Sequence, residues 1–252
     1  MVLGAQLYTV RMYIQTEKDL DFTLHKISEI GYKMVQVSGI SPSIRPEVVR
    51  ELCDKYAISI VVTHSDVNRV LYDTEKLIEE HNIMGSNYIG IGSMPEKYRT
   101  PEWVEHFKLD FKEPIKKIKD SGKLFMYHNH DFEFEKMDGV YYLDYIADAF
   151  KPDELGFTLD TYWIHAAGCD VCDWINKLKD RIPCVHLKDM AMFHHKQVMA
   201  PVLDGNMNFK RILESLAKSN CEYLLVEQDT CQESPFVCLE KSYRNLNMLG
   251  YE

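Results

Sequence analysis

The chain has 252 residues, 46% of them hydrophobic and 12% aromatic, with a formal net charge of −10. A composition this rich in apolar side chains supports a sizeable core and excludes a disordered chain. The negative charge argues against a nucleic-acid partner, because contacts to phosphates require a basic surface.

The lack of a recognisable targeting signal and the pattern of cysteines predict a cytoplasmic protein. The N-terminal segment lacks the basic and long apolar regions of a signal peptide, and no apolar stretch reaches the ~18 residues of a membrane helix, so we expect no membrane partner. Seven cysteines is an odd number, and their scatter favours reduced thiols. Cys169 and Cys172 have CxxC spacing but no matching second pair, which favours a structural role.

Short apolar runs alternate along the chain with segments of helical spacing. The predicted strands are Leu3–Thr9, Met34–Ser38, Ile58–His64, Tyr88–Gly92, Leu124–His130, Gly156–Tyr162, Cys184–Lys188 and Tyr223–Gln228. The helical stripes are Leu20, Leu24, Ile27 and Ile30, closed by Gly31; Trp103, Phe107, Phe111, Ile115 and Ile118, closed by Gly122; and Leu213, Leu216 and Ala217.

These elements predict an α/β fold, a single (β/α)8 TIM barrel over residues 1–252. The predicted strands are apolar on both faces, as parallel strands covered by helices must be. Eight such units in about 250 residues match the size of this barrel. The alternative, an open doubly wound sheet, would need a glycine-rich phosphate loop after the first strand, and residues 8–13 (YTVRMY) contain no glycine.

In such a barrel, chemistry lies at the C-terminal ends of the strands. The polar side chains at the predicted strand ends are Gln6 and Arg11, Gln36, His64, His128 to Glu133, Asp160 with Trp163 and His165, His186 with Lys188 and Asp189, and Glu227 with Asp229. Asp160, His186 and Glu227 end neighbouring strands, and this mixture of carboxylates and an imidazole suits one divalent ion such as Mn²⁺, Co²⁺, Mg²⁺ or Zn²⁺.

A fourth ligand is expected from the stretch 124–139, LFMYHNHDFEFEKMDG. A structural explanation is also open there. The alternation of Phe132 and Phe134 with Glu133 and Glu135 fits a half-buried strand, and residues 137–139 fit a turn. We adopt this explanation for Glu135 alone.

Several segments carry a resemblance to a known family. They are GAQLYTVR, EIGYKMVQVSG, VVTHSD, LFMYHNHDFEF, LDTYWIHAAG, CVHLKD and YLLVEQD, and together they span essentially the whole chain. The chain resembles the xylose-isomerase-like TIM-barrel superfamily of sugar isomerases and epimerases. Its nearest branch is that of the sugar phosphate isomerases/epimerases, which includes inosose-dehydratase-like proteins.

The resemblance implies a Glu, Asp, His, Glu quartet that binds one divalent ion, with the glutamates also moving protons. Asp160, His186 and Glu227 match the last three members of this quartet. At the position of the first glutamate stands His128. Either His128 is itself the ligand, or Glu133 folds back to complete the metal set.

The implied activity is a divalent-metal-dependent isomerase or epimerase acting on a sugar, keto-sugar or cyclitol. The reaction would remove a proton next to a carbonyl and pass through an enediolate. Loss of a hydroxide from the same enediolate would make the protein a dehydratase (lyase) of a keto-sugar or inosose, and a metal-free sugar-binding barrel is a third reading. An endonuclease-IV-like enzyme would need more strand-end histidines and a basic rim.

Within this reading, Glu227 is one proton carrier, and Glu133 or His128 is the other. Lys188 either steadies the developing enolate oxygen or pairs with Asp189. The predicted substrate-binding side chains are Tyr8, His64, His130 and Trp163. The last two strands are followed by no glycine-rich phosphate cradle, which favours an unphosphorylated substrate. A homo-oligomer is compatible with the sequence.

Overall fold

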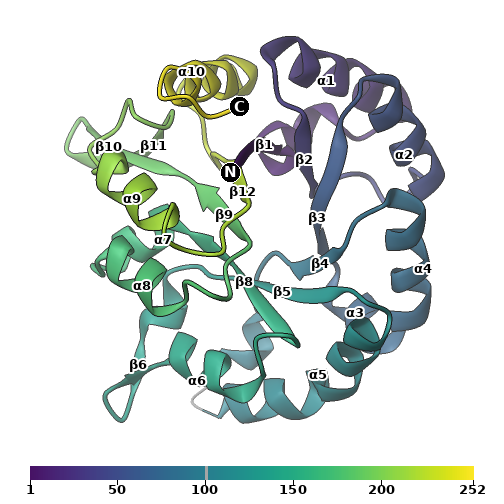
Figure 1. The fold of residues 1–252 in the computed structure, drawn as a ribbon, viewed down its shortest axis with the longest axis vertical. Coiled ribbons are helices and arrows are strands. Elements are labelled where there is room, and N and C mark those ends of the chain that lie inside the picture. The colour runs from purple at the N-terminus through teal and green to yellow at the C-terminus, as the bar shows by residue number, and fades with distance from the viewer. Residues whose placement is uncertain (100–101) are drawn as a thin grey trace.

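Eight parallel strands close into a barrel surrounded by helices (Figure 1). The structure is a computed structural model that describes residues 1–99 and 102–252. The barrel strands are β1 Val2–Gln6, β2 Met34–Val37, β3 Ser59–Ser65, β4 Tyr88–Ile91, β5 Leu124–His128, β8 Leu155–Asp160, β9 Cys184–Leu187 and β12 Tyr223–Val226. Their order around the barrel is β1-β12-β9-β8-β5-β4-β3-β2. The predicted (β/α)8 TIM barrel is confirmed.

The helices form the outer layer of the barrel. The α-helices are α1 Glu17–Ile30, α2 Pro46–Lys55, α3 Val67–Tyr72, α4 Thr74–Met84, α5 Trp103–Asp120, α6 Tyr142–Ala149, α7 Thr161–Ala166, α8 Val171–Lys177, α9 Phe209–Leu216 and α10 Pro235–Asn247. Short 3-10 helices are η1 Leu7–Tyr13, η2 Glu96–Tyr98 and η3 Phe132–Phe134. The stripe predicted for α1 is buried at Leu20, Leu24 and Ile27, while Thr16 caps its N-terminus. The described part of the chain contains no helix long and apolar enough to cross a membrane.

Seven of the eight predicted strands end one to three residues earlier in the structure, and three of these ends carry polar groups that matter for the site. The first ends at Gln6, whose side chain accepts a hydrogen bond from the backbone of Tyr8 and opens η1. The sixth ends at Asp160, whose carboxylate caps α7. The fifth ends at His128, so the polar residues after it lie on a loop. Each strand therefore delivers a polar side chain to the C-terminal mouth of the barrel.

Two hairpins lie outside the barrel. They pair β6 Lys136–Met137 with β7 Val140–Tyr141, and β10 Asp189–Phe193 with β11 Lys196–Ala200. The interpretation of residues 132–135 as a half-buried strand is wrong, because 132–134 form η3 and Glu133 is buried beside Phe134. The predicted turn at 137–139 is confirmed, with Asp138 at φ 52° and Gly139 at φ 84°.

Candidate metal centre and cavity

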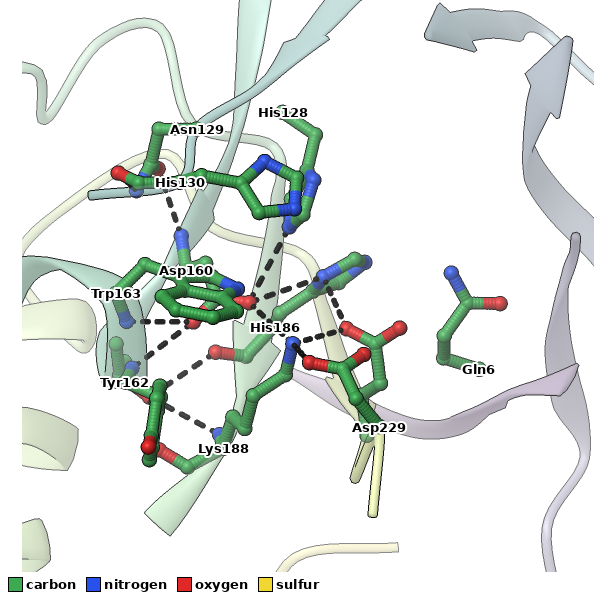
Figure 2. A network of polar contacts seen from close by, with 12 residues as sticks. Gln6, His128, Asn129, His130, Asp160, Tyr162, Trp163, His186, Lys188 and Asp229 are labelled. Carbon is green, nitrogen blue, oxygen red and sulfur yellow. Dashed lines mark hydrogen bonds and ion pairs between the residues drawn. The ribbon is translucent and has the colours of Figure 1, made fainter. Parts of the chain in front are cut away.

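Four side chains meet at the C-terminal ends of β5, β8, β9 and β12. They are His128, Asp160, His186 and Glu227, all buried, and one ligand atom from each lies within 4.8 Å of the others. Strand register explains the grouping, because Asp160 pairs with His186 across β8 and β9. Figure 2 shows His128, Asp160 and His186 pointing toward one another.

The two histidines have fixed orientations. His128 donates from Nδ1 to the carbonyl oxygen of Gly92 at 2.8 Å, and His186 donates from Nε2 to Oε1 of Gln36 at 2.7 Å. In each neutral ring the other nitrogen then carries the lone pair, and it faces the carboxylates. His128 Nε2 lies 3.2 Å from Asp160 Oδ2, and His186 Nδ1 lies 2.9 Å from Glu227 Oε2. Metal-binding histidines are typically oriented by such an acceptor on the far nitrogen.

The two carboxylate oxygens of Asp160 make different contacts. Oδ1 accepts from the backbone N–H groups of Tyr162 and Trp163, at 2.9 and 3.1 Å, which caps α7. Oδ2 faces the two histidines and Lys188. Burial alone would raise the pKa of Asp160, but the Lys188 ammonium and the histidines hold it well below its usual range. The same balance of burial against Lys188 and His186 lowers the pKa of Glu227.

The group fits a divalent cation. His186 Nδ1 and Glu227 Oε2 are buried, and neither makes a hydrogen bond of acceptable geometry with residues 1–99 or 102–252. Two imidazole nitrogens and two carboxylate oxygens match the donors preferred by Zn²⁺, Co²⁺ and Mn²⁺. Burial lowers the pKa of His186, but Glu227 and Asp160 outweigh it and raise the pKa to about 9. The two carboxylates thus draw positive charge to His186 Nδ1, and a divalent ion that bound there would displace this proton.

Lys188 lies at this group and not beside Asp189. Its Nζ is 3.0 Å from Asp160 Oδ2, 2.9 Å from Glu227 Oε2 and 3.0 Å from Asp229 Oδ2. The alternative of a Lys188–Asp189 ion pair is wrong. The Asp189 carboxylate instead accepts backbone N–H groups from residues 190, 203, 205 and 207, which fixes the loop after β11.

Glu133 does not join the ligand group, so the expectation that it folds back to complete the metal set does not match the geometry. Its Oε1 accepts from Tyr127 Oη at 2.7 Å, and its Oε2 accepts from the backbone N–H of His130 at 2.8 Å. Tyr127 packs against Phe107 of α5, so its hydroxyl holds Glu133 on the helix side of β5. Burial raises the pKa of Glu133 to about 7. His128 is the β5 side chain in the group.

A cavity of about 540 Å³ opens over the cluster. All four predicted substrate-binding side chains line it: Tyr8, His64, His130 and Trp163. Within the described residues, His64 Nε2, His130 Nδ1 and Trp163 Nε1 are buried polar atoms without a hydrogen-bond partner. Burial and the neighbouring His128 lower the pKa of His130 to about 3, and that of His64 falls well below its usual value for the same reasons. Neutral imidazoles thus face the cavity.

Three residues acquire roles that the sequence did not assign. Gln36 orients His186, Asp229 contacts Lys188, and Arg11 lines the cavity with its guanidinium 4.3 Å from the Tyr8 ring centroid. All three were visible as polar residues near strand ends. For Asp229 a further signal existed, because residues two apart on an extended segment share a face, and Glu227 is a site residue.

The comparisons with known proteins agree with this architecture. Residues 24–235 match the model of the xylose isomerase-like TIM barrel family. A sugar phosphate isomerase/epimerase from Parabacteroides distasonis has a similar structure, with 20% identity and TM-score 0.81 over 97% of this chain and 92% of that one. The structure of an L-ribulose 3-epimerase has 14% identity and TM-score 0.75, over 99% and 94% of the two chains.

A third similar structure is that of the IOLI protein with a bound zinc atom, at 12% identity and TM-score 0.72 over 99% of this chain and 98% of that one. A search of curated proteins finds no significant match. At these identities the solved structures support the fold alone. The family model is the stronger finding, because it matches most of the sequence. The chain therefore belongs to the xylose isomerase-like TIM barrel family.

Proposed function

We propose that the protein is a divalent-metal-dependent isomerase or epimerase of a sugar, keto-sugar or cyclitol. The reaction removes a proton next to a carbonyl and passes through an enediolate. One observation carries the proposal: His128, Asp160, His186 and Glu227 converge at the floor of a sugar-sized cavity, with both imidazole lone pairs turned inward.

His128, Asp160, His186 and Glu227 would hold the ion, with His128 as the ligand from β5. When bound, the ion supplies Lewis acidity, which makes the C–H next to a substrate carbonyl easier to deprotonate. The similar IOLI structure contains a zinc atom, and the similar epimerases act on sugars or sugar phosphates by their names, which supports this assignment.

The chain's own groups divide the remaining work. Glu227 lines the cavity and would accept or return the substrate proton from the β12 side. Lys188 Nζ would hold a developing oxyanion by its positive charge. On the opposite walls, His64 Nε2 and His130 Nδ1 have no hydrogen-bond partner among the described residues, and these neutral imidazoles would form hydrogen bonds with substrate hydroxyls. The strands β3 and β5 that supply these walls each lie three positions from β12 around the barrel.

The aromatic side chains would orient the substrate. Trp163 and Tyr8 present ring surface to the cavity, and sugar rings pack their apolar C–H faces on such surfaces. The indole N–H of Trp163 has no hydrogen-bond partner among the described residues and would donate to a substrate hydroxyl. Together these contacts would fix the face of the sugar that meets Glu227.

The test is isotope exchange. Protein loaded with Mn²⁺ is incubated in D₂O with a panel of ketoses, sugar phosphates and inososes, and proton NMR follows the carbon next to each carbonyl. We expect exchange and interconversion for at least one substrate class. Asp160→Ala and His186→Ala should each lose both exchange and Mn²⁺ binding, with circular dichroism showing the barrel still folded.

Glu135→Ala serves as the control, because Glu135 is an exposed carboxylate outside the cavity and should leave exchange unchanged. An Asp160→Ala enzyme that binds Mn²⁺ and exchanges normally would refute the assignment. Release of water with loss of a substrate hydroxyl would instead identify a dehydratase.

A further inference from the structure

The side chain of Lys188 places an ammonium group inside the proposed ligand set. Its Nζ lies 3.0 Å from Asp160 Oδ2, 2.9 Å from Glu227 Oε2 and 3.0 Å from Asp229 Oδ2. The Lys188 side chain is about 1% exposed, and Figure 2 shows it reaching between Asp160 and Asp229.

Two of these three oxygens are also the ligand oxygens proposed for the divalent ion. Asp160 Oδ2 faces both histidines, and Glu227 Oε2 faces His186 Nδ1. A metal ion and the ammonium would therefore share two carboxylate oxygens. Like charges that share ligands repel strongly where solvent is excluded. The third oxygen, on Asp229, belongs to the ammonium alone.

The geometry places the Lys188 ammonium among three carboxylates. Asp160, Glu227 and Asp229 each present one oxygen to Lys188 Nζ at 2.9 to 3.0 Å. Three carboxylates offer three negative charges, which one divalent ion and one ammonium would balance.

We propose that Lys188 is a built-in competitor of the divalent ion, which lowers the affinity of the site for the metal. Asp229 limits this competition, because it gives the ammonium a carboxylate oxygen outside the proposed ligand set. The inference rests on the proposed metal site and adds a positioning role for two residues. Its consequence is a site that binds its ion reversibly and exchanges it.

The experiment measures Mn²⁺ affinity by calorimetry and by the electron paramagnetic resonance of free Mn²⁺. Mn²⁺ is chosen because the seven cysteines would bind softer ions such as Zn²⁺. Lys188→Met should bind Mn²⁺ about tenfold or more tightly than the wild type. Arg11→Met is the matched control. It also removes one positive charge from the cavity wall. The Arg11 guanidinium donates to the backbone carbonyls of Tyr8 and Asp229 and to none of the proposed ligand oxygens, so its effect should stay below about threefold.

Asp229→Asn should weaken Mn²⁺ binding by about tenfold, because a neutral amide oxygen attracts the ammonium less than a carboxylate does and the ammonium then interacts more strongly with the two shared oxygens. The same change in a Lys188→Met background should have no effect. Comparing Asp229→Asn in the wild-type and Lys188→Met backgrounds separates an effect that acts through Lys188 from a direct attraction between Asp229 and the metal. The Asp229 side chain is 25% exposed, so Asp229→Asn should fold even if Lys188→Met, with its unpaired carboxylates, does not.

Three results would overturn the inference while leaving the proposed function intact. They are unchanged Mn²⁺ affinity in Lys188→Met, equal tightening in Lys188→Met and Arg11→Met, or unchanged affinity in Asp229→Asn. Failure of the proposed function looks different, because no Mn²⁺ would bind to either the wild type or Lys188→Met.

Discussion

Glu133 shows how one buried carboxylate acquires an unusual proton affinity. It is fully buried and accepts hydrogen bonds only from Tyr127 Oη and the His130 backbone N–H, without a cation in contact among the described residues. Burial raises its pKa, and the two hydrogen bonds offset only part of the rise, so the pKa moves from 4.5 to about 7. A group with a raised pKa in the folded state stabilises the fold below its unfolded pKa, and this contribution is lost as the pH rises to the folded value.

Glu133→Gln should remove this pH dependence. A glutamine can accept from the His130 N–H through its carbonyl and donate its amide N–H to Tyr127 Oη, so the packing is kept. The free energy of unfolding of the variant relative to wild type should rise by roughly 3 kcal/mol between pH 4.5 and 7.5. Urea unfolding across this range measures the difference. Glu135→Gln, at an exposed site, should show no such change, and a pH-independent difference for Glu133→Gln would contradict the prediction.

The four proposed metal ligands could be predicted from the sequence to the extent that they end strands. Asp160, His186 and Glu227 follow apolar runs, and the barrel rule places such residues together. The choice between His128 and Glu133 could not be made, because it depends on which side of β5 each side chain lies. The sequence also did not show which groups accept the hydrogen bonds that orient the two imidazoles. For His128 the acceptor is the backbone carbonyl of Gly92, and a contact to a backbone atom cannot be read from residue types.

At the scale of elements, the errors fall where local contacts override periodicity. The alternation at 132–135 suggested a strand, but residues 132–134 form a 3-10 turn closed by backbone hydrogen bonds, and the Glu133 carboxylate accepts from the backbone N–H of His130 just before it. The β10–β11 hairpin was missed for a related reason. Its base is fixed by the Asp189 carboxylate, which accepts hydrogen bonds from the loop after β11, and no hydrophobic pattern encodes such contacts.

Two glycines of the barrel strands, Gly90 and Gly156, let neighbouring groups approach the backbone closely. The neighbouring groups differ between the two positions. A Cβ on Gly90 would lie 2.7 Å from the Thr63 backbone oxygen on β3. A Cβ on Gly156 would lie 2.9 Å from Leu124 Cδ2 and 2.9 Å from Met126 Sδ, the far ends of flexible side chains. The backbone cannot move aside, whereas the side chains can rotate.

Gly90→Ala should therefore be the more damaging substitution. We expect it to lower the free energy of unfolding by about 3 kcal/mol and Gly156→Ala by about 1 kcal/mol, within the range for overpacked cores. Urea unfolding of both variants at one pH gives the comparison. An equal or smaller loss for Gly90→Ala would show that the Thr63 carbonyl is not a rigid neighbour.

For the whole molecule, the sequence was a good guide because all eight barrel strands are apolar on both faces. That property gives the number of strands and implies helices on the outside, and the missing glycine-rich loop after the first strand favoured a closed barrel over an open sheet. What the sequence could not show is the balance of charges at the centre of the mouth. Three carboxylates, two imidazoles and one ammonium come from the ends of four different strands, and the way their charges combine emerges only when these are assembled.

The stability of the whole barrel should depend on the metal ion. A ligand that binds only the folded state stabilises it by mass action, by about 2.7 kcal/mol at 100 times the dissociation constant and about 1.4 kcal/mol more per further decade. We expect the wild-type unfolding midpoint to rise steadily with the logarithm of Mn²⁺ concentration and to fall back when a chelator is added. Thermal unfolding followed by circular dichroism measures it.

Asp160→Asn is the decisive companion variant for this measurement. Its side-chain oxygen can still accept from the backbone N–H groups of Tyr162 and Trp163, so the cap of α7 is kept. Its amide nitrogen replaces Oδ2 and cannot bind a cation, so Mn²⁺ should no longer raise the midpoint. If Mn²⁺ stabilised Asp160→Asn as much as the wild type, the ion would be binding elsewhere on this acidic chain, and the four residues at the barrel mouth would not be its site.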